Sequence, residues 1–223
     1  MDTAPERPPV DESLADTCRV FSELGVATVY EASGRRGLID IPLIPLLAGK
    51  RVAGPALTVL CGQGDNLMVH AAMERVFPGC VLVITMPEPE PVALVGELLA
   101  IQAQVRGAAA LLVDAAVRDV DELRAMGLPI WTRFIRVRGA TKERPGGIDV
   151  PVVVGGTRIE PGDLVILDDD GGVVVTRTDI PTVLEKARAR AERETRLRRE
   201  LLAGALTYDV HGLRRLVEGQ EGP

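Results

Sequence analysis

The stretch GELLAIQAQVRGAAALLVDAAVRDVDELRAM, residues 96–126, decides the predicted fold. Its apolar run at 109–113 predicts a buried parallel strand, and the helical patterns at 96–106 and 119–126 predict a helix on either side of that strand. Arg118 and Asp119 come just past the carboxyl end of the strand, which is the edge where open α/β sheets bind ligands. The segment therefore predicts both a βαβ architecture and the position of a site.

The chemistry of the same segment predicts a pocket for a small anion. A helix that begins at Gly96 leaves backbone N–H groups unpaired, and these groups can bind a carboxylate. The Arg118 guanidinium can form a fork with a carboxylate, and Asp119 can hold a hard divalent cation through oxygen. The simpler alternative for Arg118 and Asp119 is a local salt bridge at a helix start. With the upstream helix included, the segment favours a small, carboxylated, metal-chelating ligand such as a 2-oxo acid.

Strand and helix patterns alternate through the first two thirds of the chain, which predicts parallel βαβ units. We expect strands at 56–60, at 81–84 and from residue 130, helices at 11–24, 27–34 and from residue 65 to about 76, and a loop at 40–49. Short apolar runs separated by Gly-Gly and Pro-Gly turns then predict an antiparallel layer, at 150–154, 163–167 and 172–176. A long helix laced with Arg and Glu follows at 180–203.

These elements predict an α/β protein, specifically a layered α/β/β/α sandwich with βαβ units, a short antiparallel layer and helical N- and C-terminal extensions. Residues 1–10 are rich in Pro, and we expect them to be disordered. No linker or internal repeat follows them in the sequence, so residues 11–223 are expected to form a single domain.

Composition argues against several classes of function. The net charge is −6 and only 3% of the 223 residues are aromatic, so nucleic acid is not expected as a partner. No apolar run approaches the roughly 20 residues of a membrane span, so no membrane partner is expected. The polar start lacks the pattern of a secretory signal, and Cys18, Cys61 and Cys80 are too scattered for a disulfide framework or a zinc site. We therefore expect a cytoplasmic protein, with Cys61 and Cys80 as inert core thiols.

From about residue 14 to residue 217 the chain resembles a known family, the divalent-metal-dependent 4-hydroxy-4-methyl-2-oxoglutarate and 4-carboxy-4-hydroxy-2-oxoadipate aldolases. The noncatalytic regulators of ribonuclease activity share the fold of this family. The specific signature is Arg118-Asp119-x-x-Glu122 with Gly96 upstream. Other matching segments mark the fold, namely 27–32, 64–66, 96–99, 150–152, 161–163 and 168–171.

The resemblance implies how the substrate and the metal are bound. The backbone amides of Leu98 and Leu99, which follow Gly96, would hold the pyruvyl carboxylate. Arg118 would bind the keto oxygen and stabilise an enolate. Asp119 would anchor Mg²⁺ or Mn²⁺, mostly through a water shell, as suits a small octahedral ion.

The resemblance also implies two catalytic glutamates. Glu97 matches an aspartate thought to orient a proton-shuttling water, and Glu194 matches a glutamate that reaches the site of a neighbouring subunit. A homotrimer or homohexamer is therefore implied, although a solvated helix face is an equal alternative for Glu194. Glu97 is one methylene longer than the aspartate, and the Pro-rich loop at 87–91 replaces an aromatic-containing loop of the oxoadipate branch. Both differences lie beside the substrate, so the sequence leaves the substrate open.

The implied reaction is class II aldol cleavage of a 4-hydroxy-2-oxo dicarboxylic or tricarboxylic acid to pyruvate and a second 2-oxo acid. Decarboxylation of oxaloacetate yields the same pyruvate enolate, so it is expected as a side activity. Two alternatives remain: a noncatalytic, protein-binding regulator, and a lyase of the same fold acting on another 2-oxo acid. The joint presence of Glu97, Asp119 and Glu194 favours the enzyme.

Several other residues could suggest chemistry but have simpler interpretations. Residues 168–170 are three aspartates before Gly171, which predicts a turn between strands rather than a metal site. His70 is interpreted as a packed or surface histidine. Lys142 could form a Schiff base with a carbonyl substrate, but nothing around it in the sequence suggests a lowered pKa, so it is interpreted as structural.

Overall fold

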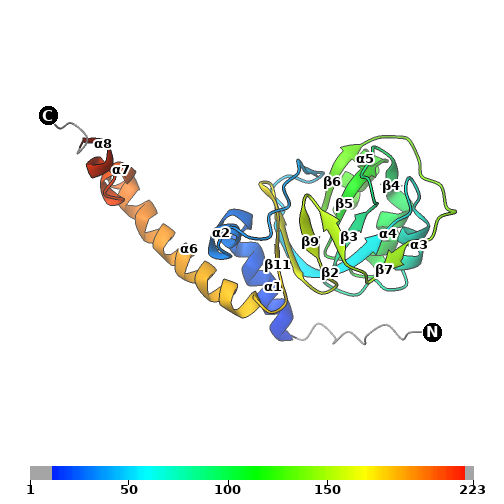
Figure 1. Cartoon of the computed structure of the whole chain (residues 1–223), viewed down its shortest axis with the longest axis horizontal. Helices are drawn as coiled ribbons and strands as arrows, with labels where there is room; N and C mark the ends of the chain where they lie inside the picture. Colours follow the sequence, from blue (N-terminus) through cyan, green and yellow to red (C-terminus); the bar gives the residue numbers. More distant parts are fainter. Residues whose placement is uncertain (1–11, 219–223) are drawn as a thin grey trace.

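The computed structural model describes residues 12–218, and the predicted disorder of residues 1–10 lies outside them. A curled, mostly buried sheet forms its centre (Figure 1). Four parallel strands adjoin in the order β6, β5, β3, β2, where β2 is Val52–Leu60, β3 is Val81–Thr85, β5 is Ala110–Val117 and β6 is Ile130–Ile135. The antiparallel strands β10 (Leu164–Asp168) and β11 (Gly171–Val175) continue the sheet beyond β2. Short strands complete it, namely β1 (Ile44–Pro45) on β6, β4 (Ala93–Val95) on β5 and β7 (Gly147–Ile148) on β2.

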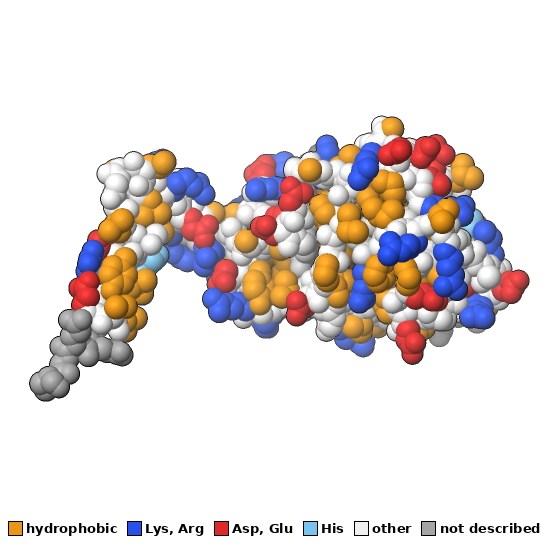
Figure 2. All heavy atoms as spheres, turned by 90° about the horizontal axis from the view of Figure 1, so that it is seen from above, with side chains coloured by type: hydrophobic (Ala, Val, Ile, Leu, Met, Phe, Trp, Pro, Cys, Tyr) orange, Lys and Arg blue, Asp and Glu red, His pale blue; other side chains and the backbone are white. Residues whose placement is uncertain are grey.

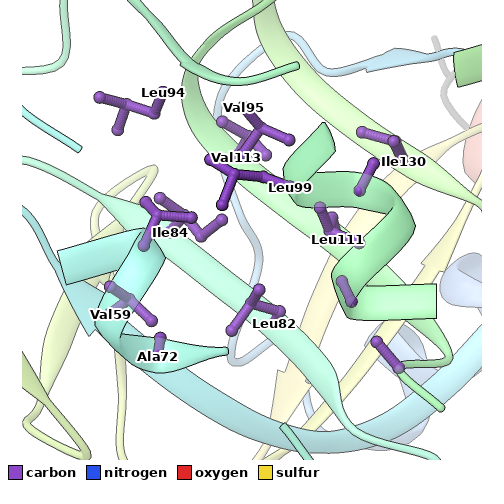
Figure 3. Close-up of a cluster of buried hydrophobic side chains, with 14 of the residues drawn as sticks. Val59, Ala72, Leu82, Ile84, Leu94, Val95, Leu99, Leu111, Val113 and Ile130 are labelled. Carbon is purple, nitrogen blue, oxygen red and sulfur yellow. The ribbon is translucent and has the colours of Figure 1, made fainter. Parts of the chain in front are cut away.

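Three short helices cover one face of the parallel strands: α3 (Leu67–Ala72), α4 (Glu97–Val105) and α5 (Val120–Met126). Alternate residues of the strands, such as Leu82 and Leu111, point at these helices and contact residues such as Leu99 in one buried cluster (Figure 3). Because β3 and β5 are buried on both faces, their sequences are nearly continuous apolar runs, with Thr85 and Asp114 as the exceptions, rather than alternating patterns.

The opposite face of the sheet packs against a second β layer. The hairpin β8 (Val152–Val154) and β9 (Thr157–Ile159) and the inner side of β10 contact Val83 and Leu112 of the parallel strands. Trp131 is buried in this layer, where its indole N–H donates to the Asp168 carbonyl oxygen at 2.8 Å. Because the chain has few aromatic residues, its core depends on Val, Leu and Ile, and these residues form most of the buried cluster between the two β layers.

The fourth layer consists of helices from both ends of the chain. α1 (Glu12–Leu24), α2 (Val26–Ala32) and the start of α6 (Ile180–Leu202) pack on the outer side of β10 and β11 through Phe21, Val29 and Val183. The order of layers is therefore α/β/β/α, which confirms the predicted sandwich. α6 then leaves the body and carries α7 (Thr207–Val210) and α8 (Arg214–Val217) at its far end (Figure 1). Hydrophobic side chains are exposed at this end (Figure 2). No helix among the described residues is long and apolar enough to cross a membrane.

Several predicted elements differ from the structure. β5 continues to Val117, beyond the predicted end at 113, with a register shift between Val113 and Ala116. The predicted helix from residue 65 to about 76 ends as α3 at Ala72, because the next N–H groups bond three residues back as turns. β1 lies in the predicted loop at 40–49. Two of the three strands predicted as a separate antiparallel layer, β10 and β11, belong to the main sheet, because β10 pairs with the free edge of β2.

Two smaller predictions are confirmed. The aspartates at 168–170 end β10 and turn into β11, as the following glycines indicated. Cys61 is a core residue, and its burial raises the pKa of the thiol to about 12, so the thiolate is not available at neutral pH.

Candidate active site

The carboxyl end of β5 and the start of α4 meet because β4 pairs with β5. The Arg118 N–H donates to the Val95 carbonyl oxygen at 3.1 Å, so the residue that ends β4 is fixed beside the residue that follows β5. Asp119 then adopts a left-handed backbone conformation with φ 60° and ψ 45°, which is uncommon for a residue other than Gly. This turn directs α5 away and leaves the Asp119 side chain at the start of α4.

The Asp119 carboxylate lies at the N-terminus of α4. Its Oδ2 accepts a hydrogen bond from the Glu97 N–H at 3.1 Å and lies 3.7 Å from Arg118 Nε. A Cβ atom at Gly96 would come within 2.4 Å of the same oxygen, so only Gly allows this close approach. Arg118 and Asp119 are both partly exposed, which leaves them accessible to a ligand.

Two backbone donors beside this carboxylate have no acceptor. Leu98 and Leu99 are the second and third residues of α4, and a helix does not satisfy the N–H groups of its first turn. The Ala100 N–H is the first that bonds within this helix, to the Gly96 carbonyl oxygen at 3.1 Å, and within residues 12–218 the amides of Leu98 and Leu99 have no hydrogen-bond partner. The helix dipole adds partial positive charge at the same place, so this end of the pocket can bind a carboxylate.

A pocket of about 200 Å³ connects these groups to a second wall that sequence reasoning did not identify. The second wall contains Asn66 at the start of α3, His70 on α3 and Lys142 in the loop after β6. Asn66 is 8% exposed, and its Nδ2 donates to the Leu94 carbonyl oxygen at 3.0 Å. Its Oδ1 is buried and has no hydrogen-bond partner among the described residues.

The second wall changes the interpretation of two residues. Lys142 was expected to be structural, but its side chain lines the pocket and has no ion-pair partner in the described part of the chain. His70 is a surface histidine as expected, but it also lines the pocket. Partial burial, and secondly the charge of Lys142, lower the pKa of His70 below its usual 6.5, which favours the uncharged imidazole at neutral pH.

A fully buried carboxylate, Asp65, holds the Lys142 loop in place. Asp65 Oδ2 accepts hydrogen bonds from the Thr141 hydroxyl at 2.6 Å and from the N–H groups of Glu143 and Arg144 at 2.6 and 3.1 Å. Its Oδ1 accepts from the Leu67 N–H at 2.8 Å, which ties the loop to the start of α3. Burial would raise the pKa of Asp65, but these donors outweigh it and lower the pKa to about 2.

The structure brings together most, but not all, of the predicted site residues. Gly96, Leu98, Leu99, Arg118 and Asp119 line one pocket. Glu97 begins α4 with a half-buried side chain and is not among the residues that line the pocket.

Glu194 lies on α6, in the layer on the other side of the molecule from α4 (Figure 1). It pairs with Arg190 at 2.8 Å, and Arg190 lies 3.9 Å from Glu31 of α2. Within one chain, Glu194 is therefore not part of the pocket.

The donor set at this site fits a small divalent cation bound mainly through water and ligand oxygens. Asp119 is the one carboxylate that lines the pocket, and the described residues contain no group of three His, Cys, Asp or Glu side chains that could hold a metal alone. Mg²⁺ and Mn²⁺ accept such incomplete protein coordination, whereas zinc sites usually take at least three protein ligands. The absence of a side chain at Gly96 lets Asp119 Oδ2 approach the start of α4, and the Asp119 side chain is 40% exposed.

Taken together, the structure is an α/β protein with one pocket that is lined by unpaired helix amides, a guanidinium and a single carboxylate. Comparison with known proteins agrees with this fold. Residues 17–175 match the model of the RraA-like family, described as Aldolase/RraA, and the chain belongs to this family.

The relatives of the chain carry two kinds of name. A Halalkalibacterium halodurans protein named "Putative 4-hydroxy-4-methyl-2-oxoglutarate aldolase" is 35% identical over 175 residues, which are 78% of this chain and 80% of that protein. A Burkholderia multivorans protein with the same name is 38% identical over 149 residues, 67% of this chain and 90% of that protein. The structure of Streptomyces coelicolor RraAS2, described as an unusual member of the RNase ES inhibitor RraA protein family, is 30% identical with a TM-score of 0.75 and covers 87% of this chain and 99% of its own. The relatives thus support an aldolase-type protein and include regulators of the same fold.

Proposed function

We propose that this protein is a class II pyruvate aldolase that depends on a divalent metal. It cleaves a 4-hydroxy-2-oxo dicarboxylic or tricarboxylic acid to pyruvate and a second 2-oxo acid, and it decarboxylates oxaloacetate as a side activity. The observation that carries the proposal is the placement of the unpaired α4 amides, the Arg118 guanidinium and the Asp119 carboxylate on one pocket. These are the groups that a 2-oxo acid requires.

The substrate binds through its pyruvyl half. Its carboxylate accepts hydrogen bonds from the amides of Leu98 and Leu99, and its keto oxygen lies against Arg118. Mg²⁺ or Mn²⁺ anchored by Asp119 would polarise the 2-oxo acid as a Lewis acid. Arg118 remains charged at any working pH, so its positive charge is available when the enolate forms.

Cleavage breaks the bond between C3 and C4. The 4-hydroxyl loses its proton, the C3–C4 electron pair moves into the pyruvate enolate, and C4 becomes the carbonyl carbon of the second product. A proton then returns to C3 to give pyruvate. We assign the orientation of the water that carries these protons to Glu97, the first residue of α4, whose side chain would have to turn towards the pocket when substrate binds.

We further propose that the site is completed by a neighbouring subunit in a homotrimer or homohexamer. Glu194 lies on α6, which leaves the body of its own chain and forms an arm with α7 and α8. Hydrophobic side chains at the end of this arm are exposed. An arm of this shape can reach a second copy of the chain. Glu194 of the partner subunit would then contribute to the proton transfer in this pocket.

The proposal is tested by pyruvate release from a small panel of 4-hydroxy-2-oxo acids and from oxaloacetate, measured with a coupled lactate dehydrogenase assay. We expect turnover that EDTA abolishes and that Mg²⁺ or Mn²⁺ restores. The proposal fails if the protein is inactivated irreversibly by borohydride plus pyruvate while EDTA has no effect, because that result indicates a Schiff base on lysine.

The second candidate is a protein-binding regulator, which the similarity to RraAS2 favours. Such a protein would release no more pyruvate from any acid of the panel than a protein-free control does, with or without metal. The same assay therefore distinguishes the two functions.

A further inference from the structure

Lys142 is a pocket residue that the proposed reaction of the pyruvyl half does not use. It lines the same pocket as Arg118 and Asp119 but comes from a different part of the chain, the loop after β6. Arg118 has Asp119 within 3.7 Å, whereas Lys142 has no carboxylate partner among the described residues. A positive charge in a ligand pocket without a counter-charge is available to an anionic group of the ligand.

The loop that carries Lys142 is fixed in position, although it contains no helix or regular strand. Asp65 binds three donors of this loop with one carboxylate oxygen, and the Asn66 N–H donates to the Thr141 carbonyl oxygen at 2.9 Å. Thr141 and Glu143, the residues on either side of Lys142, both donate hydrogen bonds to Asp65. These bonds fix the backbone of the loop on both sides of the lysine.

We propose that Lys142 binds the second carboxylate of the substrate, on the half that leaves, and that Asp65 is a positioning residue for Lys142. This inference rests on the proposed function for the identity of the pyruvyl half. The α4 N-terminus takes the first carboxylate, and the wall formed by Asn66, His70 and Lys142 faces the rest of the ligand. Since the uncharged form of His70 is favoured at neutral pH, Lys142 provides the charge that distinguishes a dicarboxylate from a monocarboxylate.

The experiment measures binding of two ligands that differ only at their far end. 2-Oxoglutarate and 2-oxopentanoate have the same five-carbon chain, with a carboxylate and a methyl group respectively at C5. Their Kd values are measured by calorimetry in the presence of Mg²⁺ for the wild type and for Lys142→Met, Lys142→Arg and Lys50→Met. Lys50 is an exposed lysine outside the pocket and serves as the matched control.

We expect the wild type and Lys50→Met to prefer 2-oxoglutarate by roughly 10-fold or more, the effect of one charge-assisted contact. Lys142→Met should lose this preference through weaker binding of 2-oxoglutarate, and Lys142→Arg should retain part of it. The inference is overturned if Lys142→Met weakens both ligands equally, or if the wild type does not distinguish them. If the preference behaves as expected but the hydroxylated acids yield no pyruvate, the proposed function fails and the binding role of Lys142 stands.

Discussion

Gly96→Ala is expected to disable the site while it leaves the fold intact. Gly96 is the residue before α4, and its backbone has φ −134°, an extended conformation that alanine adopts without strain. The methyl group is therefore the only perturbation. It would be placed next to the carboxylate that we assign to the metal.

The size of the effect follows from one distance. The new Cβ atom would lie 2.4 Å from Asp119 Oδ2, where ordinary contacts begin at 3.4 Å, so the carboxylate must move by about 1 Å. This movement also breaks the 3.1 Å hydrogen bond from the Glu97 N–H to the same oxygen. A displacement of about 1 Å in a catalytic group can cost roughly 10²-fold in rate. We expect a loss of that order in kcat/KM, and at least 10-fold weaker binding of Mn²⁺.

The assay combines pyruvate release with a Mn²⁺ titration followed by electron paramagnetic resonance, and thermal unfolding checks the fold. Gly139→Ala is the comparison for metal binding, because its Cβ atom would lie 3.0 Å from Arg118 Nη1 and would not contact Asp119. We expect Gly139→Ala to weaken Mn²⁺ binding less than Gly96→Ala does, by about 10-fold. The reasoning is refuted if Gly96→Ala binds Mn²⁺ and turns over like the wild type, since Asp119 would then have no fixed role at the helix start.

Three further predictions test the site, the loop and the assembly. Arg118→Lys should lower kcat by roughly 10²-fold in a folded protein, because lysine cannot replace the planar guanidinium; near-normal turnover would make Arg118 only a salt-bridge partner. Asp65→Asn should have a lower free energy of unfolding in urea than the wild type above about pH 4, and this difference should vanish as the pH falls towards 2. The reason is that the lowered pKa of Asp65 contributes stability only while Asp65 is ionised. A difference that is independent of pH would contradict this prediction. Glu194→Ala and Arg118→Ala proteins should each be nearly inactive, and a refolded mixture should recover part of the activity through hybrid sites; a fully active monomer in light scattering would disprove the shared site.

The sequence allowed the first wall of the pocket to be predicted because local patterns determine it. The apolar run before Arg118 indicates a buried strand, and Gly96 with the helical spacing after it indicates a helix start. A ligand site at the carboxyl edge of such a sheet is a general property of the architecture. The structure adds the strand β4, three residues whose pairing with β5 fixes Gly96 against Asp119.

The second wall could not be predicted because contacts distant in sequence create it. Asp65 has the pattern of a helix cap, and it does accept the Leu67 N–H, but its other oxygen binds a loop 76 or more residues later. Nothing near Lys142 in the sequence indicates this partner. The one signal in the sequence was a carboxylate in the segment after the strand β2, since such a charge, if the fold buries it, requires donors from elsewhere in the chain.

Glu194 poses a different problem, because its proposed role depends on a second molecule. The sequence indicates a long polar helix, and the structure confirms that α6 leaves the body of its own chain. Neither observation specifies which surface the arm contacts. The mixing experiment above addresses this point directly, since hybrid activity requires residues from two chains at one site.

The two walls of the pocket differ in how they are built, and this difference has a consequence for substrate choice. The wall that would form the enolate depends on helix amides, on the close approach at Gly96 and on the constrained backbone of Asp119, so few substitutions can preserve it. The wall that would bind the departing half depends on side chains, one of them in a loop held by Asp65. If both proposals hold, substitutions at Lys142 would change the second product without disturbing formation of the pyruvate enolate. On this argument, the reaction type would depend on the backbone around α4 together with the Arg118 and Asp119 side chains, while the choice of substrate would depend on the loop after β6.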